Sequence, residues 1–145
     1  MKLNKLLQDM QAGKPLKTSA RMRALAKKKV EHARVRNALV KAACAETSCW
    51  PDEYRRKKIK SPLYLHCAAV ATVIQALYGG DIVTGTVKDI THYWNRLPDG
   101  KEVDYTSCQF GGDGLTPFKK GRKVNRKGPT NPRFLIFAKR VMENL

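Results

Sequence analysis

Three residues in the second half of the chain, Cys67, His92 and Asp104, are of the types that together perform nucleophilic catalysis on carbonyl carbons. A cysteine attacks as its thiolate, a histidine holds the proton, and a carboxylate orients the histidine through its other ring nitrogen. Cys67 opens a long apolar run, so we expect it in the first turn of a helix, where unpaired N–H groups stabilise a thiolate. The sequence therefore favours a Cys-His-Asp site.

Each of the three residues also has a structural interpretation. A buried cysteine is often a small core side chain, a histidine beside Tyr93 and Trp94 can be packed in a strand, and an aspartate before Thr106 can cap a turn. His66 is an alternative base, although adjacent helix residues point about 100° apart, which makes it the weaker choice. An active triad and a set of structural residues are both open at this point.

The elements that must position the nucleophile are helical. The segment LHCAAVATVIQALY at 65–78 predicts a buried helix that is stopped by Gly79-Gly80. A final helix is predicted at 131–144. Residues 52–62 are interpreted as a charged connection, and 111–127 as a loop rich in Gly, Lys and Arg.

The histidine and the aspartate are expected on strands. Residues 82–87 and 89–97 predict two strands, and a tight Pro-Asp-Gly-Lys turn leads into a third at 102–105. This hairpin carries His92 on one arm and Asp104 on the other. Both side chains can point towards the same helix end if His92 and Asp104 lie on the same face of the sheet.

The chain is strongly basic, and its charge is concentrated at the N-terminus. Across 145 residues, 29 Lys and Arg against 12 Asp and Glu give a net charge of +17, and residues 1–42 hold twelve of these basic side chains with only two acidic ones. Apolar residues between Thr18 and Ala45 recur at helical spacing. We therefore predict a basic helical extension at 1–42 and an α+β domain at 43–145, in which the helix bearing Cys67 packs on an antiparallel sheet.

Such a charge attracts nucleic acid, an anionic membrane or an acidic protein, or simply forms a solvated face. The alternative function is thus a non-enzymatic protein that binds nucleic acid or an acidic host protein. Base stacking is not favoured, because Phe118 is the only nearby aromatic residue in the loop. The candidate anion-binding residues are Arg23, Lys27, Lys28 and Arg34 in the helix, and Lys119, Lys120, Arg122 and Lys123 in the loop.

Several classes of protein are disfavoured by what the sequence lacks. It has no apolar run of membrane-spanning length and no apolar signal-peptide core, so we expect a cytoplasmic protein with reduced cysteines. The four cysteines lack the paired spacing of a zinc site. We expect neither a metal nor a cofactor.

The segment HYWNRLPDGKEVDYTSCQF at 92–110 resembles the signature of YunG-like proteins, H-(Y/F)-W-N-x-L-x-D-G-x-E-x-D-x-T-x-x-Q-F. The resemblance extends over about 43–145 and includes five further dipeptides: Cys49-Trp50, Cys67-Ala68, Gly79-Gly80, Pro129-Thr130 and Arg133-Phe134. The basic extension beside such a domain is also similar to accessory proteins of bacteriophages and mobile elements, which implies a host cytoplasm.

The YunG-like family is in turn similar to the papain/transglutaminase-like superfamily, in which a helix carries the Cys and neighbouring strands carry the His and Asp. The resemblance implies a cysteine-dependent peptidase, amidase or deamidase that forms a thioester. It implies Cys67 as nucleophile, His92 as base and Asp104 as the residue that orients it. The residues that the resemblance implies as support for the substrate and the oxyanion are His66, Trp94, Asn95 and Gln109. Because the family has Gln where this chain has His66, backbone N–H groups at the helix start are expected to contribute more.

Overall fold

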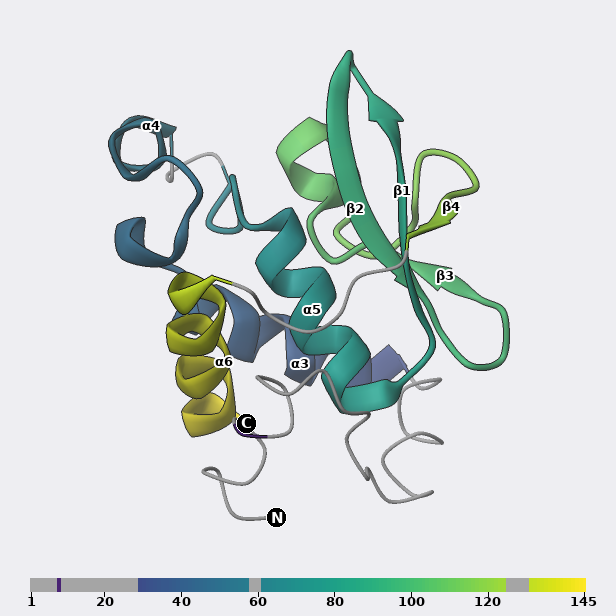
Figure 1. Ribbon diagram of the computed structural model, residues 1–145, viewed down its shortest axis with the longest axis horizontal. Coiled ribbons are helices and arrows are strands. Elements are labelled where there is room, and N and C mark those ends of the chain that lie inside the picture. The colour runs from purple at the N-terminus through teal and green to yellow at the C-terminus, as the bar shows by residue number, and fades with distance from the viewer. Residues whose placement is uncertain (1–7, 9–28, 58–60, 125–130) are drawn as a thin grey trace.

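Helix α5, Cys67–Tyr78, occupies the middle of the molecule, between the other helices and a sheet (Figure 1). The structure is a computed structural model that describes residues 8, 29–57, 61–124 and 131–145. The predicted anion-binding residues Arg23, Lys27 and Lys28, and the predicted helix start near Thr18, lie outside the described residues.

The apolar run predicted to form a buried helix does so. Eight of its residues are buried, and it ends at Gly79, whose φ of 77° lies where glycine is favoured. The helix begins at Cys67, two residues later than predicted, because Leu65 has a φ of 62° and cannot belong to a right-handed helix. The late start leaves Cys67 in the first turn.

The sheet has four antiparallel strands, β1 (Asp81–Val87), β2 (Ile90–Arg96), β3 (Glu102–Val103) and β4 (Arg122–Val124), in the order β3-β2-β1-β4. The predicted hairpin is present, with Asn95 opposite Val103, but its second strand ends at Val103, so Asp104 follows the strand and does not lie on it as predicted. Strand β4 was predicted as loop because its three residues are polar or partly exposed and show no apolar alternation. It is fixed by its pairing with β1.

The remaining helices are α3 (Lys29–Ala42), α4 (Pro51–Lys57) and α6 (Pro132–Asn144), with short 3-10 turns at Ala45–Thr47 and Ser107–Phe110. Helix α6 begins as predicted: Pro132 is its first residue, and the side chain of Asn131 accepts a hydrogen bond from the backbone N–H of Arg133. Helix α4 corrects the interpretation of 52–62 as a connection only, since Pro51 opens a short helix there.

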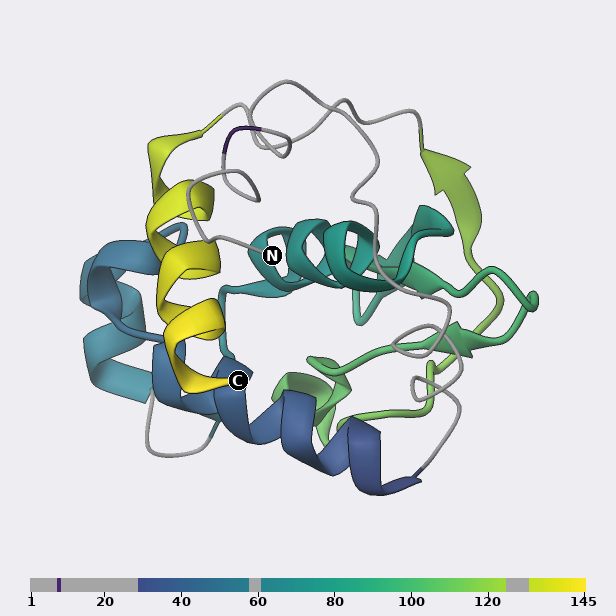
Figure 2. The same ribbon diagram turned by 90° about the horizontal axis from the view of Figure 1, so that it is seen from below.

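The hydrophobic core is shared by three helices and the sheet. Side chains of α3, including Val35 and Leu39, pack in one cluster with residues of α5 and α6, such as Ile74 and Phe137. Figure 2 shows α6 beside α3, and α5 between α6 and the sheet. Helix α3, which lies in the predicted 1–42 extension, therefore packs in the same core as α5 and α6.

The α+β class and the antiparallel sheet are as expected, and α5 packs against β2 as predicted. Within the described ranges, no helix is both long enough and apolar enough to cross a membrane.

Candidate active site

Cys67 is the first residue of α5 and is partly buried. The first N–H groups of an α-helix have no partner within the helix, and its dipole is positive at this end. Both features therefore lie next to the sulfur of Cys67. The local sequence creates this position, because the turn at 61–64 and the left-handed backbone of Leu65 direct the chain into the helix just before Cys67.

His92 and Asp104 form a buried pair. Nε2 of His92 lies 2.7 Å from Oδ2 of Asp104, and both side chains are almost fully inaccessible to solvent. The second carboxylate oxygen, Oδ1, accepts hydrogen bonds from the backbone N–H and the hydroxyl of Thr106, each at 3.0 Å. The carboxylate is thus held as an acceptor, and Nε2 of His92 donates to it.

Cys67 lies near enough to the ring of His92 to act on its charge. Since Nε2 faces Asp104, the remaining nitrogen, Nδ1, is the one available to the thiol. Burial by itself lowers the pKa of His92, but the hydrogen bond that its ring donates to Asp104, together with the nearby sulfur of Cys67, outweighs burial and raises the pKa to about 9. At neutral pH the ring is therefore an imidazolium, between a carboxylate and a sulfur. The structure brings the three predicted residues together.

Two aromatic rings enclose His92. Trp94 stacks on it with ring centroids 5.5 Å apart and 29° between the planes, and Phe110 meets it edge-on at 4.9 Å. Trp94 is fixed by a hydrogen bond from Nε1 to Glu102. Gly85 on the neighbouring strand leaves room for its ring, because a Cβ at this position would lie only 2.8 Å from the Cη2 atom of Trp94. A tryptophan face stabilises a cation above it, so Trp94 supports the charged form of the ring.

Asn95 and Gln109 connect the elements that carry the site. Asn95 donates from Nδ2 to the carbonyl oxygen of Ala71 in α5 at 2.9 Å, which fixes β2 against this helix. Gln109 lies with Nε2 3.5 Å from Nδ1 of His92, while its Oε1 is 3.5 Å from the backbone nitrogen of Leu65. Gln109 therefore places an amide group between the histidine and the residues that precede Cys67.

His66 is turned into the protein interior. Its Nδ1 lies 2.8 Å from the carbonyl oxygen of Tyr64, and its Nε2 lies 2.7 Å from the hydroxyl of Thr47. Burial lowers the pKa of His66, so the ring is neutral, with Nδ1–H donating to Tyr64 and Nε2 accepting from Thr47. This arrangement leaves no ring N–H for the oxyanion contact expected from the sequence.

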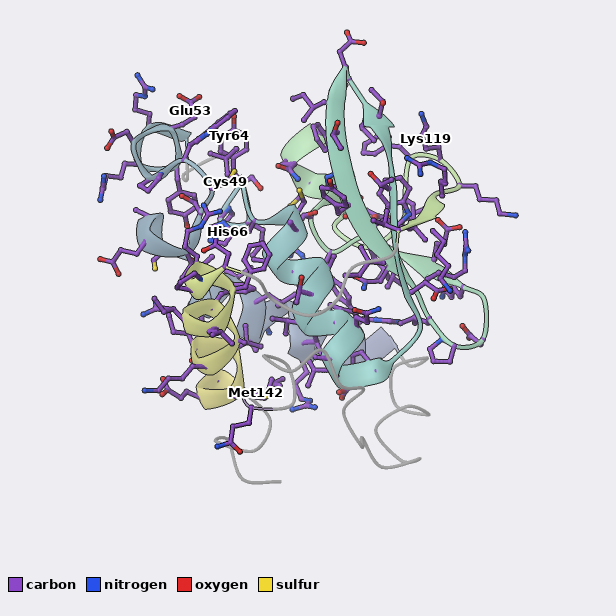
Figure 3. The ribbon with its side chains drawn as sticks, in the orientation of Figure 1. Cys49, Glu53, Tyr64, His66, Lys119 and Met142 are labelled. Atoms are coloured by element: carbon purple, nitrogen blue, oxygen red, sulfur yellow. The ribbon has the colours of Figure 1, made fainter. Side chains whose placement is uncertain are left out.

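A pocket of about 240 Å³ opens beside Cys67. Figure 3 shows Cys49 close to His66 and to the N-terminal end of α5. Sequence reasoning did not propose Cys49 or Arg133 as site residues, although both belong to dipeptides that carry the family resemblance. The wall of this pocket includes Cys49, Leu65, Ala68, Asn131, Arg133 and Phe134.

Those of the predicted basic residues that the structure describes do not line this pocket. Lys119, Lys120, Arg122 and Lys123 are exposed, and Lys119 lies on the opposite side of the molecule from Cys49 (Figure 3). Arg34 forms a two-pronged ion pair with Glu31 in α3. Among the described residues, no group of three or more His, Cys, Asp or Glu side chains is arranged to hold a metal ion.

Comparison with curated proteins gives no match, and comparison with solved structures gives none. A family model described as YunG protein matches residues 31–145, which is most of the chain and includes α5, the whole sheet and α6. The match begins within α3, in agreement with the packing of this helix in the core. The chain therefore belongs to the YunG family.

Proposed function

We propose that the protein is a cysteine-dependent hydrolase or deamidase that cleaves amide bonds through a thioester. The observation that carries this proposal is the buried, hydrogen-bonded His92–Asp104 pair, which lies beside a cysteine in the first turn of a helix. The chain order of a helix cysteine, a strand histidine and an aspartate is that of the papain/transglutaminase-like superfamily, although Asp104 lies one residue beyond β3 and the superfamily carries its aspartate on the strand. This likeness supports the proposal and extends it to a papain-like arrangement.

In the proposed reaction, the Cys67 thiolate attacks the amide carbonyl carbon, and the carbonyl oxygen becomes an oxyanion. As the C–N bond breaks, the His92 imidazolium gives its proton to the departing nitrogen, which leaves as an amine or as ammonia. Asp104 keeps the ring oriented and balances its charge. The acyl group is then bonded to the sulfur as a thioester.

Water completes the cycle. His92, now neutral, takes a proton from water as the oxygen attacks the thioester carbon, and the sulfur leaves as a thiolate beside the regenerated imidazolium. The available donors for the oxyanion are the backbone N–H groups at the start of α5 and the side-chain amide of Gln109, since the His66 ring is engaged elsewhere.

The first test is alkylation of the folded protein by iodoacetamide at pH 7, followed at each cysteine by mass spectrometry. An ordinary cysteine is only a few per cent thiolate at this pH, so a stabilised thiolate at Cys67 reacts roughly tenfold or more faster than Cys44, Cys49 and Cys108. Cys49 is a demanding internal control because it is exposed while Cys67 is only partly so. Accessibility alone would make Cys49 the fastest.

The variants His92→Ala and Asp104→Asn should bring Cys67 back towards the rate of the other cysteines, whereas Cys44→Ser, outside the pocket, should leave its rate unchanged. Equal labelling of all four cysteines, or a fast Cys67 that is indifferent to His92→Ala, would remove the basis of the proposal.

A further inference from the structure

The pocket beside Cys67 is built from segments that are distant in the sequence. The first turn of α5 contributes Cys67 and Ala68, the segment before α4 contributes Cys49, and the start of α6 contributes Arg133 and Phe134. Its volume of about 240 Å³ is smaller than that of common ligand pockets, which begin near roughly 300 Å³. It can therefore hold only a small part of a substrate next to the sulfur.

Arg133 gives this pocket its charge. It is the only charged residue among the described residues that line the pocket, and no acidic side chain is among them. Its Nη1 donates to the carbonyl oxygen of Ser48 at 2.6 Å, which fixes the guanidinium in place. A guanidinium has five N–H donors, so this bond leaves others that can pair with a carboxylate.

Two further features act in the same direction. The N-terminal ends of α5 and α6, helices of 12 and 13 residues, both border the pocket through Cys67 and Arg133. Each end carries positive partial charge, which adds to that of Arg133. The same wall includes the apolar side chains of Ala68 and Phe134, which suit a short apolar group.

We infer that the amide substrate of Cys67 carries a carboxylate, which Arg133 binds while a short apolar group lies against Ala68 and Phe134. The inference rests on the proposed function and names its substrate class. Two sources of this carboxylate are compatible with the pocket: the C-terminus of a peptide and an acidic side chain close to the scissile amide.

The test compares two alkylating reagents of similar size, iodoacetate, which bears a carboxylate, and iodoacetamide, which is neutral. The measured quantity is the ratio of their rates at Cys67. Arg133→Gln should lower this ratio about tenfold, the effect of losing one charge-assisted hydrogen bond, and the ratio cancels any change in the reactivity of the thiol that both reagents share. Arg133→Lys should keep most of the ratio, because it keeps the charge.

Arg140→Gln is the matched control. Arg140 also lies on α6 and also donates to a backbone carbonyl, that of Ala42, at 2.6 Å, but it does not line the pocket. Its replacement should leave the ratio unchanged. The imidazolium of His92 attracts iodoacetate in every variant, so the comparison between variants isolates the contribution of Arg133. Thermal unfolding of each variant checks that the contact of residue 133 with Ser48 is not required for folding.

The two sources of the carboxylate are separated by protection of Cys67 from iodoacetamide. N-acetylalanine presents a terminal carboxylate, N-acetylglutamic acid α-amide presents a side-chain carboxylate, and N-acetylalaninamide is the neutral control. Protection by either acid that is lost in Arg133→Gln supports the inference and identifies the source. Equal protection by the neutral amide, or none by either acid, contradicts it.

The outcomes also separate this inference from the proposed function. A fast, His92-dependent reaction with iodoacetamide, together with a ratio unaffected by Arg133→Gln, would leave the thiolate in place and overturn the carboxylate site. A slow Cys67 whose ratio still depends on Arg133 would overturn the proposed catalysis and retain an anion-binding pocket.

Discussion

The protonation of His92 decides which step of the proposed reaction it can perform. A ring with a pKa of about 9 is an acid at neutral pH, so it is suited to donating a proton to the leaving nitrogen. Asp104 and Trp94 both favour this charged form, the first by a hydrogen bond and the second by stacking. His66, one residue before the nucleophile, has the opposite character because burial keeps it neutral.

The raised pKa of His92 makes stability depend on pH. Because its pKa rises from 6.5 to about 9 on folding, protonation stabilises the native state fully below about pH 6.5, and this contribution is lost as the pH rises through 9. At about 1.4 kcal/mol per pKa unit, the loss is on the order of 3 kcal/mol. Asp104→Asn should remove most of this decline in the free energy of unfolding.

The measurement is urea unfolding of wild type and variant at several pH values between 6 and 9.5. Asp52→Asn serves as control, since Asp52 is fully exposed and its ion pair with Arg55 lies at the surface. A decline of equal size in wild type and Asp104→Asn would mean that His92 is not the group responsible.

At the scale of elements, the sequence predicts best the helices and strands whose own residues form a clear pattern. Helix α5 is apolar on nearly every side, and the β2–β3 hairpin has clear turn residues at 98–101, so both were predicted within a few residues. Helix α4 has seven residues and buries chiefly Tyr54, too little to create a helical periodicity. Strand β4 exists through its partner β1, a contact that local sequence does not encode.

The candidate site likewise has a part that the sequence predicts and a part that it does not. Residue types and order were enough to propose Cys67, His92 and Asp104 together, because the helix and the hairpin that carry them are locally encoded. The pocket was not predictable in this way. It forms where the start of α6 meets the segment at Cys49, and that meeting depends on packing of the whole chain.

The junction between α5 and β1 gives a prediction at this scale. Gly80 has a φ of 81°, and a Cβ there would lie 2.2 Å from the backbone oxygen of Arg96 in β2. Gly80→Ala should therefore combine strained backbone with a displacement of β2 and cost at least about 2 kcal/mol of unfolding free energy. Denaturant unfolding would measure the loss.

Gly100→Ala provides a matched comparison. Gly100 has a similar φ of 88°, but nothing lies within 4 Å of an added Cβ. Its substitution should cost only the backbone term, about 1 kcal/mol. Similar losses in the two variants would show that β2 can move away from the α5–β1 junction.

At the scale of the whole molecule, the domain boundary suggested by charge is not the one indicated by the packing of the core. The basic composition suggested a boundary at residue 42, but the buried face of α3 belongs to the same core as α5 and α6. The hydroxyl of Tyr78 in α5 donates to Glu31, and Arg140 of α6 donates to the carbonyl oxygen of Ala42. A helix can present basic residues to solvent and still be part of the core.

Two truncations test where the folded unit begins. Deleting residues 1–42 removes Val35, Ala38, Leu39 and Ala42, all of them essentially inaccessible to solvent, and should abolish cooperative unfolding. Deleting residues 1–28 leaves these side chains in place and retains the family match, which starts at residue 31, so it should preserve both cooperative unfolding and His92-dependent alkylation of Cys67. If the shorter protein lacking 1–42 still unfolded cooperatively and kept a fast Cys67, the support of α5 would have to come from α6 and the sheet alone.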